Sequence, residues 1–103
     1  MSALDKTFKN IVKIANSFDK NYERAHPLDG GAFEINSSIE AYHLSDGYRE
    51  LIVVCYDEIY LDQLIIKIKA YLENNPTSLR IYFSKAIKIG SRYKKILGVS
   101  IWI

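Results

Sequence analysis

The amino-acid sequence predicts a single α+β domain over 1–103, with two helices packed on one face of a four- to five-stranded, mostly antiparallel sheet. Three observations predict this fold class. A chain of 103 residues fits one domain, two segments show the apolar spacing of amphipathic helices, and the other apolar segments alternate with the period of strands. The expected order of elements is α-β-β-β-α-β-β. A hydrophobic content of 49% with 25% charged residues is typical of a folded chain rather than a disordered one.

The first predicted element is an amphipathic helix that starts after Ser2 and ends at His26. Ser2 is placed to cap the helix, with Asp5 three positions later as its capping-box partner. His26 precedes Pro27, and a residue in that position avoids the helical conformation. Apolar residues recur every three or four positions, as expected for a helix with one buried face: Leu4, Phe8, Ile11, Val12, Ala15, Phe18 and Tyr22.

Two or three strands are predicted between the two helices. Segments 32–36 and 39–44 alternate between apolar and polar residues, as half-buried strands do. For 39–44 the alternative is a single helical turn capped by Ser38, and we favour the strand. Residues 45–47 read Ser-Asp-Gly, which predicts a hairpin turn into the next strand. Segment 48–56 is apolar at every central position, so we expect an interior strand that is covered on both faces.

The second helix is predicted to begin at Asp57 and Glu58, where acidic side chains suit the positive end of the helix dipole. Residues 74–76 read Asn-Asn-Pro and stop it. Its apolar stripe has helical spacing: Leu61, Leu64, Ile65, Ile68 and Leu72.

Two further strands, 79–89 and 93–103, are predicted to follow, joined by a turn at 90–92. Lys85 interrupts the apolar side of the first strand, which predicts a bulge or the end of the strand near Ser84 and Lys85. The final strand has apolar residues on both faces, which favours an interior position. An edge position would instead allow it to pair across a dimer.

Charge is distributed very unevenly along the chain. Residues 29–73 contain nine acidic and three basic side chains, whereas 74–103 contain six basic side chains and no acidic one. The formal net charge of +2 hides this polarity. Because an uneven field steers charged partners, we expect two surfaces of opposite sign.

Several chemical classes receive little support from the sequence. Cys55 is the single cysteine and lies in an apolar run, which predicts a buried thiol and a reducing, cytoplasmic compartment. Together with two separated histidines it matches no zinc-ligand spacing, so we expect no metal and no cofactor. No apolar run is long enough to span a membrane, and the first residues contain no signal core.

Our first functional hypothesis is a small protein-binding inhibitor, of the immunity or antitoxin type, that neutralises a toxin or enzyme domain by direct contact. Such a protein needs a stable fold and a polar, aromatic contact surface, and no catalytic motif. Acidic side chains would meet a basic, nuclease-like target. Abundant Ile, Lys, Asn and Tyr, whose codons are AT-rich, fit a bacterial or mobile-element origin. The predicted protein-binding residues are Glu50, Asp57, Glu58, Tyr60 and Asp62. The structural alternative is that the acidic residues at 57 and 58 only cap the helix.

The alternative hypothesis is a nucleic-acid-binding protein that uses its basic C-terminal hairpin. Bases and an aromatic on one strand face can hold phosphates and stack a nucleobase. An isoelectric point of about 8.6 lies below the value above about 9 that is typical of nucleic-acid-binding domains. A solvated outer sheet face explains the same residues. The predicted nucleic-acid-binding residues are Arg80, Tyr82, Lys88, Arg92, Lys94 and Lys95.

A third hypothesis is a small ribonuclease-type enzyme that uses His26 and His43 as general acid and base. Nothing in the spacing of these histidines brings them together, and no nucleophile or phosphate-binding motif accompanies them. We therefore expect no enzymatic activity and no catalytic residues.

Overall fold

The computed structural model describes residues 2–25, 38–55, 58–89 and 94–103, and these form two helices and one four-stranded sheet. Helix α1 spans Ala3–Ala25 and helix α2 spans Glu58–Asn74. The strands are β1 (Ser38–Ser45), β2 (Tyr48–Cys55), β3 (Arg80–Ile89) and β4 (Lys94–Trp102). The predicted α+β class and two-helix arrangement are confirmed. The predicted strand 32–36 lies outside the described residues.

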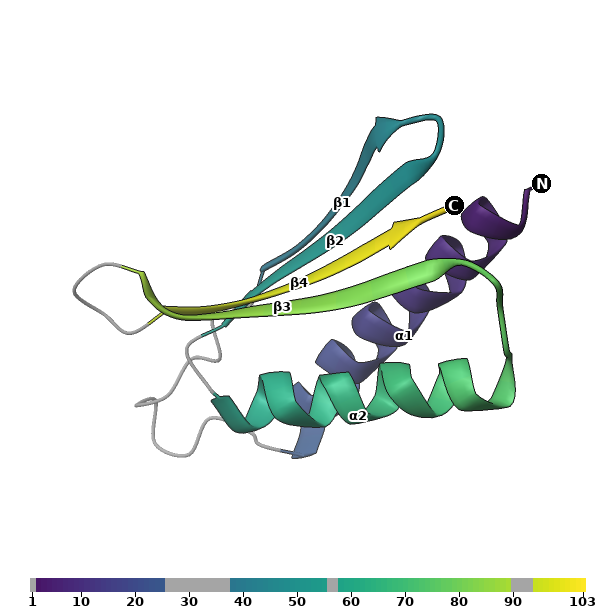
Figure 1. Ribbon diagram of the computed structural model, residues 1–103. Helices are drawn as coiled ribbons and strands as arrows, with labels where there is room; N and C mark the ends of the chain where they lie inside the picture. Colours follow the sequence, from purple (N-terminus) through teal and green to yellow (C-terminus); the bar gives the residue numbers. More distant parts are fainter. Residues whose placement is uncertain (1, 26–37, 56–57, 90–93) are drawn as a thin grey trace, which may run out of the picture.

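All strand pairings are antiparallel, and the strand order is β1-β2-β4-β3. Both helices lie on the same face of the sheet, which leaves a two-layer molecule (Figure 1). Strand β4 pairs with β2 on one side and with β3 on the other, so the prediction that the final strand is interior is confirmed. Strands β1 and β3 form the two edges.

The start of α1 follows the predicted capping box. The Ser2 hydroxyl accepts a hydrogen bond from the backbone N–H of Asp5 at 3.1 Å and donates one to the Asp5 carboxylate at 2.9 Å. The backbone N–H of Lys6 donates to the Ser2 carbonyl at 3.0 Å. These bonds satisfy donors that would otherwise be unpaired in the first turn, which fixes where the helix begins.

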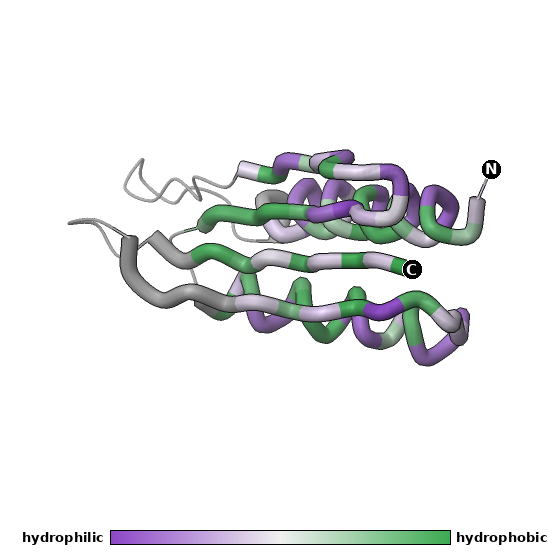
Figure 2. The backbone as a smooth tube through the Cα atoms, turned by 45° about the horizontal axis from the view of Figure 1, so that its top comes forward, coloured by the Kyte–Doolittle hydropathy of each residue, from purple (hydrophilic) through white to green (hydrophobic). Residues whose placement is uncertain are grey.

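The core lies between the helices and the sheet. Helix α1 contributes one buried stripe and α2 another, and β2 and β4 contribute alternate residues. Figure 2 shows that the hydropathy alternates along β4, whereas β2 is hydrophobic throughout its second half. The buried apolar residues of the strands are Leu51, Val53, Cys55, Leu97, Val99 and Ile101. Hydrogen bonds link the helices from the Asn10 amide to the Tyr71 hydroxyl (2.9 Å) and from the Tyr60 hydroxyl to Asp19 (2.6 Å).

Two sequence-based predictions about the strands are wrong. Strand β2 is interior by hydrogen bonding, but only its helix-facing residues are buried. Ile52 and Val54 on the other side are half-exposed, because the described part of the chain places no second layer over them. The predicted bulge near Ser84 is also misplaced. Pairing with β4 continues through Lys85, and the register shifts only between Ile87 and Ile89.

A buried arginine joins α1 to the β1–β2 turn. Arg49 is 8% exposed and forms a salt bridge with Asp5 at 3.0 Å. Its guanidinium also donates to the backbone carbonyls of Ser45 and Tyr48. Because a buried cation is costly unless paired, this network ties the start of the helix to the hairpin.

Candidate functional site

The candidate functional site is the face of the sheet that the helices leave uncovered, which we call the open face. Its residues occupy the strand positions between the buried ones, as paired residues of antiparallel strands point to the same side. The described side chains of the open face are Glu40, Tyr42, Tyr48, Glu50, Ile52, Val54, Arg80, Tyr82, Ser84, Ile96, Ser100 and Trp102.

The strand register places these residues in rows across the sheet. One row reads Tyr42, Glu50, Ser100 and Tyr82 from β1 to β3. The neighbouring row contains Tyr48, Trp102 and Arg80 in the same order. The open face therefore carries aromatic side chains along much of its width.

Hydrogen bonds and ring contacts hold several of these side chains in place. The Tyr48 hydroxyl donates to the Ser100 hydroxyl at 3.0 Å, and the Tyr48 and Trp102 rings stack with centroids 6.1 Å apart and planes 25° apart. On β1 the Tyr42 hydroxyl donates to the Glu40 carboxylate. The open face thus presents aromatic groups whose orientations are set before any partner arrives.

The electrostatic environment of β1 and β2 is negative. The hydrogen bond to Glu40 raises the pKa of Tyr42 above its ordinary value of 10.0; partial burial and the charges of Glu40 and Glu50 act in the same direction. The Glu50 carboxylate leans over Gly98, since a Cβ built there would lie 3.8 Å from its Oε1 atom. Two carboxylates therefore lie beside Tyr42 on this half of the open face.

The other half of the sheet is basic. Strands β3 and β4 contain five basic residues and no acidic residue in their sequences, whereas β1 and β2 contain Glu40 and Glu50, with Arg49 buried against Asp5. The order β1-β2-β4-β3 sets the two hairpins side by side. The charge asymmetry of the sequence thus becomes a gradient across one sheet.

The two predicted acidic contact residues whose side chains are described, Glu50 and Asp62, do not lie together. Glu50 lies on the open face, whereas Asp62 is exposed on α2, on the other side of the sheet. Tyr60 is fully buried between the helices, which corrects the prediction that it contacts a partner. Asp57 lies outside the described residues, as does the side chain of Glu58.

Of the predicted basic site, Arg80 and Tyr82 are exposed on the open face and are neighbours on β3. Lys88, Lys94 and Lys95 belong to β3 and β4, but their side chains lie outside the described part of the chain. Arg92 is outside the described residues altogether.

Of the two histidines of the enzyme hypothesis, only His43 belongs to the described residues. The His43 ring packs edge-on against Phe8 with centroids 5.6 Å apart, at the boundary between β1 and α1. His26 falls outside the described residues. Over the described ranges, no group of three His, Cys, Asp or Glu side chains gathers in a metal-binding arrangement.

The predicted site residues do not include four open-face residues that the structure brings together: Glu40, Tyr42, Tyr48 and Trp102. The spacing of Tyr42 and Tyr48 around the apolar segment 48–56 allowed an interface role but favoured routine half-buried strand positions. The signal for Tyr48 was present, since it has the same strand parity as Glu50. For Trp102 there was no local signal, because its neighbour across the sheet depends on the pairing of β2 with β4.

Comparisons of the chain with protein-family models, with curated proteins and with solved structures gave no match. Neither helix in the described ranges is long and apolar enough to cross a membrane.

Proposed function

We propose that this protein is a small inhibitor of the immunity or antitoxin type, which binds a basic surface of a toxin or enzyme domain with the acidic half of its open face. The observation that carries the proposal is the cluster of Glu40, Tyr42 and Glu50 beside the stacked pair of Tyr48 and Trp102. Tyr and Trp are enriched at the centres of protein interfaces, and two carboxylates favour a cationic partner.

Preorganisation of this cluster supports a binding role. Ordering a long side chain at an interface costs about 0.5–1.5 kcal/mol. Tyr42 and Glu40 already bond to each other, and Tyr48 is held by Ser100 and Trp102. Binding of a partner would therefore cost less side-chain conformational entropy here than on a surface of unrestrained side chains.

A pair of charge-reversed variants tests the proposal. Glu40→Lys/Glu50→Lys reverses two charges on the open face, and Asp62→Lys/Glu73→Lys reverses two on the exposed side of α2. Affinity capture from the source organism, read by mass spectrometry, should find a basic protein held by the wild type and by the α2 variant but lost with the open-face variant. The purified partner should then lose its own activity when the wild-type protein is added.

The kinetics of the complex give a second test. Because complementary charges speed encounter, the association rate should fall steeply as salt is added. Two results would refute the proposal: capture that survives charge reversal of the open face, or a partner whose activity is unaffected by binding. If only the α2 variant loses capture, the partner binds the helices and not the open face.

The second candidate function is binding of single-stranded nucleic acid by the basic half of the open face. Tyr82 is 59% exposed beside Arg80, which is an arrangement that can stack a base and neutralise a phosphate. The carboxylates of Glu40 and Glu50 on the same face would repel the phosphates of a nucleic acid, so we rank this function second. Fluorescence anisotropy with labelled single-stranded RNA at low salt decides the matter. Tyr82→Ala should weaken genuine binding by about 1–3 kcal/mol, and the absence of binding by the wild type rejects the candidate.

A further inference from the structure

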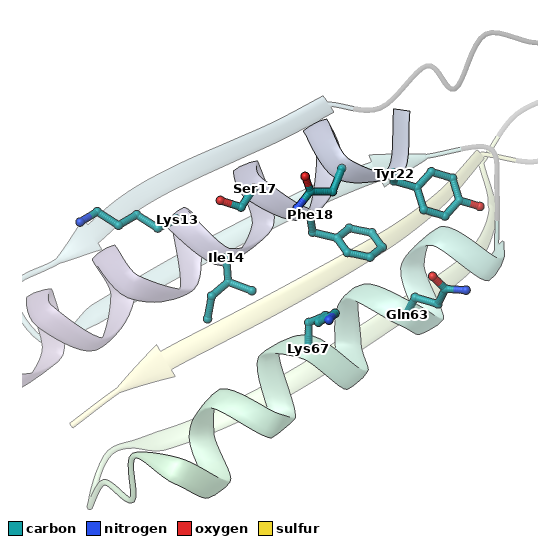
Figure 3. A pocket seen from close by; sticks show the side chains of 8 residues that line it. Lys13, Ile14, Ser17, Phe18, Tyr22, Gln63 and Lys67 are labelled. Atoms are coloured by element: carbon teal, nitrogen blue, oxygen red, sulfur yellow. The ribbon is translucent and has the colours of Figure 1, made fainter. Parts of the chain in front are cut away.

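A groove of about 460 Å³ runs along the outside of the helix layer, between α1 and α2 (Figure 3). It is separate from the open face and plays no part in the function proposed above. Helix α1 contributes apolar and polar side chains to its lining, and α2 contributes two polar ones: Lys13, Ile14, Ser17, Phe18, Asn21, Tyr22, Gln63 and Lys67.

The packing of the helices fixes which positions of α1 and α2 lie level with each other along the groove. Asn10 bonds Tyr71 at one end of the contact, and Asp19 accepts a bond from Tyr60 near the other end. These two links require α1 and α2 to run antiparallel. The same alignment sets Lys13 level with Lys67, and one turn further along it sets Ser17 level with Gln63.

The chemistry of the groove changes from its floor to its rim. Ile14, Phe18 and Tyr22 supply an apolar floor. The rim carries two lysines, one from each helix, and none of the described lining residues has a carboxylate. In the described part of the chain, neither Lys13 nor Lys67 forms a salt bridge with a carboxylate. Two like charges across an apolar floor favour a bound anion, which would offset their repulsion.

We propose that this groove binds an amphipathic organic anion, with its apolar body along Phe18 and Ile14 and its anionic head between Lys13 and Lys67. The volume lies within the range of about 300–1,000 Å³ that small-molecule sites occupy. From Lys13 to Asn21 the helix rises about 12 Å, which suits an extended chain of medium length. Ser17 and Gln63 are placed to hydrogen bond any polar group between the ends.

A second groove on the other side of α1 provides an internal comparison. It has a volume of about 480 Å³ and lies between α1 and β1, with Phe8, Val12 and His43 in its lining. Its lining also contains Lys9, Lys13 and the Asp5 carboxylate, which together carry one net positive charge, whereas Lys13 and Lys67 give the groove between the helices two. Binding of an amphipathic anion should therefore favour the groove between the helices over this one of similar size.

The test is a titration of the full chain with three probes of equal tail length, decanoate, 1-decanol and decyltrimethylammonium, followed by backbone amide NMR. Decanoate should shift Ser17, Asn21 and Gln63 and bind at least about tenfold more tightly than the cationic probe, since a charge-assisted contact is worth about one decade or more in affinity. Lys13→Gln/Lys67→Gln should weaken decanoate binding by about tenfold.

Two further variants distinguish loss of the binding site from loss of the fold. Lys6→Gln/Lys20→Gln removes two exposed lysines of α1 that do not line the groove, and decanoate affinity should stay within about twofold. Ser17→Phe fills the groove from an exposed position and should abolish binding while the circular dichroism spectrum is retained.

Four outcomes would overturn the proposal. Equal affinity for the three probes would show simple apolar adsorption. Shifts centred on Phe8 and His43, or on the exposed Ile59 and Ile66 of α2, would place the ligand elsewhere. Equal decanoate affinities of Lys13→Gln/Lys67→Gln and Lys6→Gln/Lys20→Gln would show that Lys13 and Lys67 do not hold the anionic head. Groove resonances that move on dilution of the protein, but not with decanoate, would assign the groove to a second copy of the chain.

Discussion

Tyr60 offers the sharpest test of how the two helices pack. Its side chain is fully buried, and its hydroxyl donates a hydrogen bond to Asp19 at 2.6 Å. Its ring packs edge-on against Phe18 and Tyr22, with centroids 5.0 and 5.1 Å away. The substitution Tyr60→Phe keeps the ring contacts and removes the hydroxyl alone, so it isolates the hydrogen bond between α2 and α1.

The expected loss follows from the type of bond. A hydrogen bond to a charged group contributes about 1.5–3 kcal/mol net, and the hydroxyl of Tyr60 has no access to replacement water in the folded state. We therefore expect the free energy of unfolding to fall by about 2 kcal/mol, and the melting temperature by about 10 °C for a domain of this size. Tyr60→Leu also removes both ring contacts and should cost about 1–3 kcal/mol more.

Urea unfolding followed by far-UV circular dichroism measures this loss, and the m-value should not change. Tyr82→Phe is the matched control, because Tyr82 is 59% exposed and its substitution should change stability by less than about 0.5 kcal/mol. If Tyr60→Phe lowers the free energy of unfolding as little as this control, the hydroxyl makes no stabilising hydrogen bond and the described packing is wrong. Because Tyr60 is buried, Tyr60→Phe should also leave the affinity for a captured partner unchanged.

Three further predictions concern the core, the sheet and acid stability. Leu64→Ala, at a fully buried position of α2, should lower the free energy of unfolding in urea by about 2–5 kcal/mol. Gly98→Ala should be tolerated, because the nearest atoms to a new Cβ lie at 3.6 Å; the melting temperature should stay equal or rise slightly. The hydrogen bond from Ser2, and next the bond from Arg49, hold the pKa of Asp5 below its ordinary value of 3.8. The folded chain then binds this proton less readily than the unfolded chain, so the stabilisation is present above about pH 4 and is lost as the pH falls further. Urea unfolding at several pH values should show that Asp5→Asn removes this part of the pH dependence.

Local sequence patterns were sufficient for most secondary structure. The apolar residues from Leu4 to Tyr22 recur with the spacing of a helix, and Ser2 with Asp5 marks where the helix starts. Both the existence of α1 and its first residue were therefore predictable. The turn after Ser45 was predictable for the same reason, since its residues adopt few other conformations. In each case the signal lies within a few neighbouring residues.

The site was less predictable because it depends on which strands become neighbours. Tyr48 and Trp102 stack only because β2 pairs with β4, and no local pattern specifies that pairing. Arg49 has the strand parity of Leu51 and Val53, so its burial could have been inferred, but its partner Asp5 comes from another element. The burial of Tyr60 could also have been inferred from its spacing of four residues from Leu64.

The central position of β4 also governs how this chain can fold during its synthesis. Strand β2 lies next to β4, which the ribosome makes about forty residues later, so one edge of β2 has no hydrogen-bonding partner while the intervening segment is translated. The nascent β1–β2 hairpin therefore exposes Leu51 and Val53 on an unpaired strand edge, which is a template for aggregation. Ribosomes stalled before β4 should yield chains that require chaperones, whereas release of β4 should convert them to the native sheet in one step.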